Sequence, residues 1–145
     1  MEIYTIGFTK KPAADFFGAL RGAGIKRLLD VRLNNTSQLS GFTKKADLPF
    51  FLREICGIEY IHEPLLAPMQ QLFDAYKKRK GSWADYEAAF LALLAERKIE
   101  TALDRSIFSV PTVLLCTEPT PEKCHRRLVA EYLQSKWGHL EIVHL

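Results

Sequence analysis

Hydrophobic residues occur in short runs along the chain, and between the runs they recur every three or four positions. Short runs rich in β-branched residues predict strands, and the spaced segments predict amphipathic helices. The predicted strands cover residues 3–6, 27–31, 58–61, 110–116 and 140–143. The predicted helices cover residues 13–23, 48–55, 68–80, 82–94, 99–103 and 121–137.

Strands that alternate with helices indicate an α/β fold, because parallel strands need a long connection, usually a helix. We predict one domain over residues 1–145, in which helices flank a mostly parallel sheet of about five strands in three layers. The first strand, helix and second strand should form a parallel βαβ unit with a right-handed crossover.

Reactive side chains concentrate in residues 112–127. An apolar strand ends at Cys116, Glu118 follows it, and Thr120 and Pro121 predict the start of a helix. The side chains near that helix start are Cys124, His125 and Arg126. Because open α/β sheets bind ligands at the carboxyl ends of their strands, this segment predicts a functional site. Alternatively, the thiols are small buried apolar groups and Arg126 belongs to a solvated helix face.

Other strand exits carry polar residues as well. Asp30 and Arg32 end the second strand on one face, and we expect Arg32 to form a partly buried ion pair with Asp30 or Glu118. Tyr60 and His62 end the third strand, and Thr9 follows the first. We expect seven of the polar side chains at these exits to meet in one cleft: Asp30, Arg32, Tyr60, Cys116, Glu118, Cys124 and Arg126.

The chemistry of these residues suggests an enzyme. The candidate catalytic residues, as acid, base, nucleophile or proton carrier, are Asp30, Glu118, Cys124 and His125. The candidate substrate-binding residues are Thr9, Arg32, Tyr60, His62, Cys116 and Arg126, since guanidinium groups suit phosphate. A helix start at Pro121 should bind an anion and favour the Cys124 thiolate, so Cys124 is expected to react faster than Cys56.

Two non-catalytic interpretations remain open. In a metal protein the ligands would be Cys116, Cys124 and His125, with His62 as a fourth. Neighbouring residues on a helix point about 100° apart, however, and the spacing matches no familiar zinc module, so we assign no metal and no cofactor. In a nucleic-acid-binding protein, the basic residues 77–80 beside Trp83 would form the surface, although such a run also complements a helix dipole.

Composition limits the setting. The 145 residues include 48% hydrophobic and 26% charged residues, and no apolar run approaches the roughly 20 residues that span a bilayer. The first residues do not resemble a secretory signal, and three cysteines make an odd number, so we expect reduced thiols in the cytoplasm. A net charge of +3 permits an anionic partner, either a small molecule or nucleic acid, and leaves the oligomeric state open.

Several segments together resemble the domain of unknown function 488 family. They are Thr5-Ile6-Gly7, Asp30-Val31-Arg32, Gly57 to His62, Leu114 to Glu118, Cys124-His125-Arg126 and the terminal His144-Leu145. The resemblance implies a small bacterial or archaeal α/β protein with a Rossmann-like sheet. Some members are labelled as DNA-repair proteins, which implies base processing or DNA repair as one possible function.

Overall fold

The five strands form a single, entirely parallel sheet. The structure, a computed structural model, describes all residues from 1 to 145. The strand order is β3-β2-β4-β1-β5. The strands are β1 (Glu2–Gly7), β2 (Arg27–Asp30), β3 (Glu59–His62), β4 (Thr112–Cys116) and β5 (Glu141–His144). The predicted α/β architecture is therefore confirmed.

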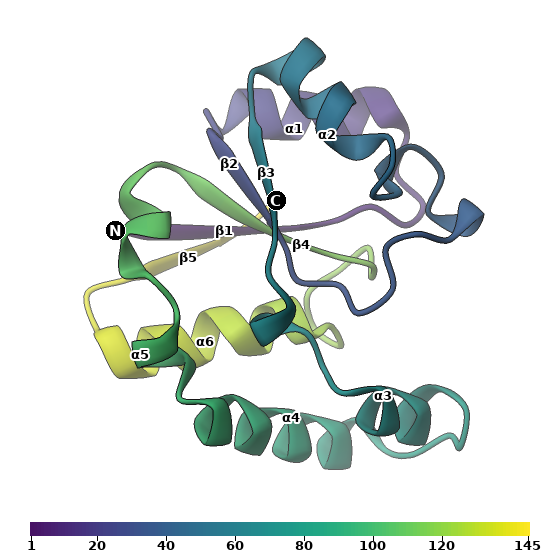
Figure 1. Cartoon of the computed structure of the whole chain (residues 1–145), viewed down its shortest axis with the longest axis vertical. Coiled ribbons are helices and arrows are strands. Elements are labelled where there is room, and N and C mark those ends of the chain that lie inside the picture. The colour runs from purple at the N-terminus through teal and green to yellow at the C-terminus, as the bar shows by residue number, and fades with distance from the viewer.

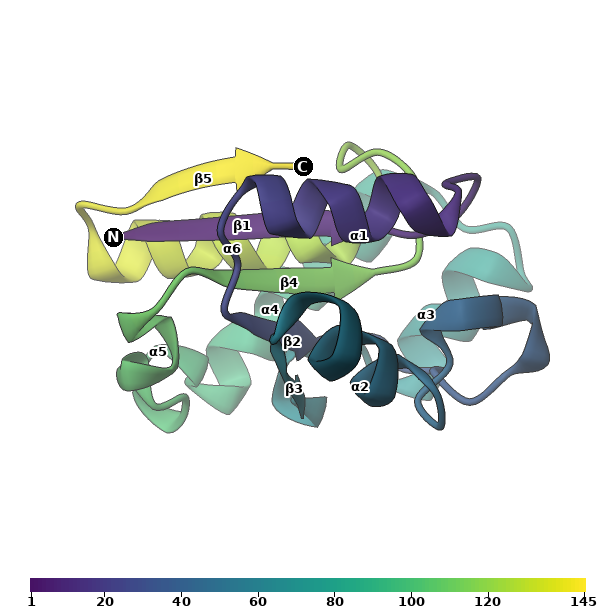
Figure 2. The ribbon, with the colours of Figure 1, turned by 90° about the horizontal axis from the view of Figure 1, so that it is seen from above.

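Helices cover both faces of this sheet, which gives three layers (Figures 1 and 2). One face carries α1 (Ala13–Gly22) and α2 (Leu48–Phe51), which continues as a π-helical turn, Leu52–Cys56. On the other side lie α3 (Gln70–Lys77), α4 (Trp83–Arg97), α5 (Ile99–Ala102) and α6 (His125–Trp137). Short 3-10 turns span Gln38–Thr43, Pro64–Leu66 and Arg105–Ser109.

The core is divided by the sheet into two apolar clusters. The larger cluster joins Leu29 and Leu114 to α4, α5 and α6, and the smaller joins Leu28 and Leu115 to α1 and α2. All five residues of β4 are buried, because this central strand has helices over both faces. Its unbroken apolar run in the sequence is the consequence.

The local signals place most helix ends correctly. The Ser82 hydroxyl accepts a hydrogen bond from the Asp85 N–H at the start of α4, which satisfies one of the first N–H groups of that helix. Gly57 ends the second helical segment with φ 65°, a left-handed conformation that glycine adopts without steric cost.

One predicted unit differs in its arrangement. β1 and β2 are parallel, but β4 lies between them and pairs with both. The chain therefore opens with a βαβ unit whose strands are not neighbours. Sequence patterns give the strands, whereas their order depends on contacts with residues more than 80 positions later.

The strand order creates a crevice between β2 and β4. These two strands are neighbours, yet the chain after β2 runs to α2 on one face and the chain after β4 runs to α6 on the other. Diverging connections leave a gap at the carboxyl ends of the strands, which is where open α/β sheets bind ligands. A membrane-crossing helix does not occur in the structure, since none is both long and apolar enough.

Candidate functional site

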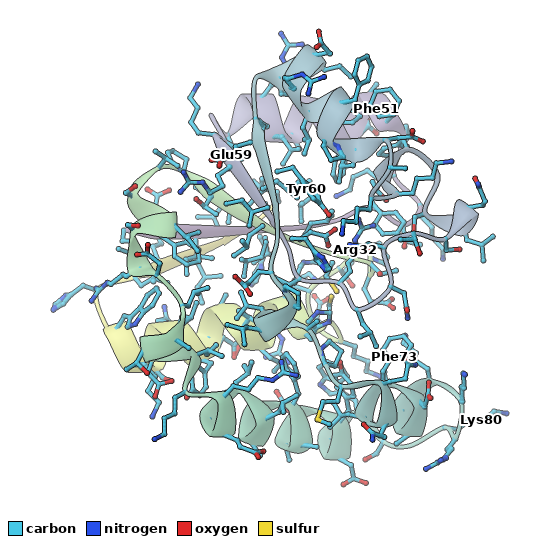
Figure 3. The ribbon with its side chains drawn as sticks, viewed as in Figure 1. Arg32, Phe51, Glu59, Tyr60, Phe73 and Lys80 are labelled. Carbon is cyan, nitrogen blue, oxygen red and sulfur yellow. The ribbon has the colours of Figure 1, made fainter.

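A pocket lies at the crevice between β2 and β4. Its inner wall is formed by the segments that follow these strands, Arg32 to Asn34 and Cys116 to Glu118, and by the start of α6. Its outer wall comes from α3 and α4. The residues of that outer wall are Phe73, Tyr76, Lys77, Trp83 and Tyr86. In Figure 3, Phe73 extends from α3 toward the loop that follows β2.

A buried ion pair holds the β2 side of the pocket. The Arg32 Nε and Nη2 atoms donate to the two carboxylate oxygens of Asp30, each at 2.8 Å, and both side chains are almost fully buried. Arg32 also donates to the hydroxyl and the carbonyl oxygen of Thr43, at 3.1 and 2.7 Å. The predicted buried ion pair is confirmed, with Asp30 and not Glu118 as the partner.

Both carboxylate oxygens of Asp30 accept hydrogen bonds from neighbouring side chains. Its carboxylate also accepts hydrogen bonds from the Tyr60 hydroxyl at 2.6 Å and the Asn35 amide at 3.2 Å (Figure 3 shows Tyr60 directed toward Arg32). Burial alone would raise the pKa of Asp30, but Arg32 and Tyr60 stabilise the carboxylate and lower the pKa below its usual value. Burial and the hydrogen bond to Asp30 raise the pKa of Tyr60. This network fixes the site and leaves Asp30 without a free oxygen for substrate.

A thiol and an imidazole meet at the base of the pocket. The Cys116 Sγ atom lies 3.2 Å from His125 Nδ1, and His125 Nε2 lies 2.6 Å from the carbonyl oxygen of Val31. Because a carbonyl only accepts, Nε2 carries a proton and donates it to Val31. Nδ1 therefore faces Cys116, and the ring orientation is fixed by the strand end.

The two buried thiols differ in acidity. Burial alone would raise the pKa of Cys116, but hydrogen bonds from Cys124 and the Thr117 N–H, with the Arg126 charge, lower it below its ordinary value. Burial and the neighbouring Cys116 raise the pKa of Cys124 well above its ordinary value. The direction of the shift in the Cys124 pKa is opposite to the one that a helix start at Pro121 would produce.

The last helix starts four residues later than the sequence indicates. It begins at His125, with Cys124 as its N-cap residue, and residues 117–124 form turns. The Arg126 guanidinium donates to the Glu118 carbonyl oxygen at 2.6 Å, and Arg127 donates to that of Glu122 at 3.1 Å. These tertiary hydrogen bonds satisfy loop carbonyls and outweigh the local helix preference of Thr120 and Pro121. The anion site expected at Pro121 thus lacks its helix.

Close packing around Gly7 holds the same loop against β1. A Cβ atom on Gly7 would lie 1.7 Å from the Glu118 carbonyl oxygen and 2.9 Å from Arg126 Nη1. A backbone hydrogen bond also connects the loop to the segment after β1: the Thr9 N–H donates to the Thr117 carbonyl oxygen at 3.2 Å. Glycine is therefore required by the close approach of two backbones.

Five of the ten predicted site residues line the pocket: Arg32, Cys116, Glu118, Cys124 and His125. The others do not: Asp30, Tyr60, His62, Thr9 and Arg126. Asp30 and Tyr60 support Arg32 from behind, and His62 ends β3 beside Asp30. Arg126 is fully buried, donates to Thr5 and Glu118, and keeps one nitrogen, Nη2, without a partner. The expected convergence of seven residues in one cleft therefore holds for four of them.

Sequence patterns missed most of the outer wall. Phe73, Tyr76 and Tyr86 lie on two segments that the sequence predicted only as amphipathic helices, yet these side chains line the pocket at the strand ends. The sequence feature that indicated this wall was the basic run of residues 77–80 beside Trp83. From that run, the Lys77 ammonium lies 3.0 Å from the Glu118 carboxylate and 5.2 Å from the centre of the Tyr76 ring. A further cation, Lys123, lines the pocket and makes no hydrogen bond or ion pair within the chain.

The fold and pocket define a small parallel α/β protein with a thiol, imidazole and carboxylate site at its strand ends. Within that class, residues 12–133 match the family model described as domain of unknown function DUF488, and the chain belongs to this family. Searches of curated proteins and of solved structures found no match.

Proposed function

We propose that this protein is a small enzyme that acts on an anionic ligand with a planar aromatic group, of the nucleotide class. The observation that carries the proposal is the composition of one pocket, with reactive groups at its base and aromatic rings at its outer wall. Concave sites with few polar groups placed among apolar walls are the usual form of ligand sites.

The aromatic wall suits a flat ring. Trp83 and Tyr86 stack with their ring centres 5.2 Å apart, and Tyr76 packs against both. Such a cluster is rigid, so a nucleobase could stack on it without ordering mobile side chains first. This wall supports the choice of a planar substrate.

The charges at the pocket suit an anionic group. Lys123 has no partner, and Lys77 makes a half-exposed ion pair with Glu118 beside the Tyr76 ring. A phosphate that binds these two lysines would compete with Glu118 for Lys77. The released carboxylate would then be free to accept a proton from the substrate and to return it later, which is the role predicted for Glu118. Arg32 lines the pocket but has one N–H group left for a ligand, because four of its five N–H groups are already used.

Ligand binding should quench Trp83 fluorescence. The chain has two tryptophans, and Trp137 packs on Phe108 at the end of α6, so Trp137→Phe isolates the pocket signal. In that background we expect a nucleoside monophosphate to quench the emission. Lys123→Ala should weaken its binding about tenfold, the effect of losing about 1.4 kcal/mol. Binding of the uncharged nucleoside should be unchanged.

Lys136→Ala is the matched control, since Lys136 lies over the Tyr132 ring, away from the pocket. Equal effects of the two lysine substitutions, or no quenching by any nucleotide, would contradict the proposal. Turnover is tested separately by mass spectrometry of a nucleotide panel. Glu118→Gln should retain binding and lower the rate at least about 100-fold, as expected for a proton-transfer residue.

A nucleic-acid substrate is the second candidate, because basic residues continue from the pocket along the surface. Lys78, Arg79 and Lys80 follow Lys77 and are exposed, and Lys80 lies at the outer end of this region (Figure 3). If the bound nucleotide is part of a DNA or RNA strand, the logarithm of the binding constant should fall with the logarithm of the salt concentration. The slope should be proportional to the number of phosphates contacted. A free mononucleotide would show a much weaker salt dependence.

A further inference from the structure

We infer that Cys116, Cys124 and His125 are the ligands of a zinc ion at the base of the pocket. One ligand atom from each residue lies within 4.8 Å of the other two, and all three side chains are buried. Zinc is bound in proteins by thiolate sulfur and imidazole nitrogen, and soft thiolate ligands favour it over magnesium or calcium.

The backbone at the start of α6 allows two adjacent ligands. On a helix, the side chains of Cys124 and His125 would point about 100° apart and could not share one ion. Cys124 is not helical, since its φ of −135° and ψ of 138° are those of extended chain. Its side chain is thereby free of the helical spacing, and it reaches the same point as His125. The late start of α6 therefore allows Cys124 and His125 to bind the same ion.

The distances are close to those of a tetrahedral site. Usual zinc bond lengths place a sulfur and a nitrogen ligand about 3.5 Å apart and two sulfur ligands about 3.8 Å apart. The Cys116 Sγ atom is 3.2 Å from His125 Nδ1, so a shift of a few tenths of an ångström suffices for this pair.

His125 already has the outer hydrogen bond that zinc-binding histidines usually make. Its Nε2–H donates to the Val31 carbonyl oxygen at 2.6 Å, which leaves the Nδ1 lone pair free on the side of the Cys116 sulfur, 3.2 Å away. Such a bond fixes both the tautomer and the ring orientation, and it increases the basicity of the ligating nitrogen. The end of β2 therefore orients a ligand supplied by α6.

Three protein ligands leave one position for an exchangeable ligand. All three residues line the pocket, so that position faces the space between the strand ends and the aromatic wall. Three protein ligands and one open position are typical of catalytic zinc sites, whereas structural sites have four. A catalytic role for the ion rests on the proposed function. In that role it would act as a Lewis acid, with Glu118 as the nearby proton carrier.

The test uses the full chain with cobalt(II) as a spectroscopic substitute for zinc, under reducing conditions. We expect one zinc ion per purified chain by elemental analysis. After exchange, cobalt should give thiolate-to-cobalt charge-transfer absorption and the intense visible bands of a tetrahedral site. Azide should change the visible bands if the fourth position is exchangeable. These measurements need neither substrate nor turnover, so they can succeed even if no nucleotide binds.

Variants assign the ligands. Cys116→Ser and Cys124→Ser should each lose charge-transfer intensity and bind cobalt at least tenfold more weakly. Cys56→Ser is the matched control and should keep the wild-type spectrum, because Cys56 lies on the α1 side of the sheet, where its thiol is near the Phe17 carbonyl. Wild-type protein that is folded by circular dichroism but binds less than a tenth of an equivalent of either metal would overturn the inference. An unchanged spectrum in Cys116→Ser would do the same.

Discussion

Replacing Asp30 by Asn should destabilise the protein by about 3–5 kcal/mol at neutral pH, because it leaves the buried Arg32 charge without a counter-ion. The loss should exceed that of an ordinary hydrogen bond, since Tyr60 and Asn35 lose their charged acceptor as well. Urea denaturation at pH 7 measures it. Asp47→Asn is the control, because Asp47 forms only an exposed pair with Lys44 and should change stability by less than about 0.5 kcal/mol.

The same variant should alter the response to acid. The pKa of Asp30 is lowered in the folded protein, so its contribution is complete above the unfolded-state pKa of about 3.9 and is lost as the pH falls through the lower folded value. Wild-type stability should therefore fall more steeply below about pH 4 than that of Asp30→Asn. If the difference between the two proteins were independent of pH, the ion pair would not be the cause.

Replacing Gly7 by Ala should destabilise the protein by about 1–3 kcal/mol or more, the usual cost of overpacking. The new methyl group would overlap the Glu118 carbonyl, which is backbone and cannot rotate away. The loop of residues 117–124 would have to move, and with it Lys123 and Cys124. Thermal unfolding measures the stability loss, and weaker nucleotide quenching of Trp83 would report the displaced loop.

Gly18→Ala provides the comparison within the same chain. Gly18 lies in α1, and a Cβ atom there would meet no other atom within 4 Å. Alanine is more favourable than glycine in a helix interior. This change should therefore leave the free energy of unfolding unchanged or raise it by up to about 1 kcal/mol. Similar stability of Gly7→Ala and Gly18→Ala would show that the loop accommodates the methyl group.

Periodicity was sufficient to predict the elements of this fold. The run from Val113 to Cys116 could be recognised as a buried strand because helices on both faces favour apolar residues at successive positions. Glycines such as Gly57 ended helices as expected, since only a left-handed residue closes that turn without strain. The insertion of β4 between β1 and β2 was not predictable, because no local pattern encodes which strands become neighbours.

The residues at the strand ends could be predicted from the sequence. The parts of the site whose position depends on tertiary packing could not. Asp30 and Arg32 share a face two residues apart, which predicted their pairing. The start of α6 was misplaced because Arg126 and Arg127 satisfy the carbonyls of the preceding loop, a contact that propensity cannot register. The aromatic wall was seen only as the apolar stripes of two helices, since the direction in which α3 and α4 pack against the sheet is not a local property.

The strand order also has a consequence for the folding rate. β1 is paired on both sides by the last two strands, with Ile3 opposite Thr112 and Ile142. Because β1 precedes both of its partners in the chain, it stays unpaired until residues 112–116 of β4 have been synthesised. Contacts between residues so distant in sequence slow folding, because the intervening chain must be ordered before they form. A nascent chain of this protein should thus expose the apolar Ile3 and Ile6 until β4 is available, which makes chaperone contact with β1 an expected step in its folding.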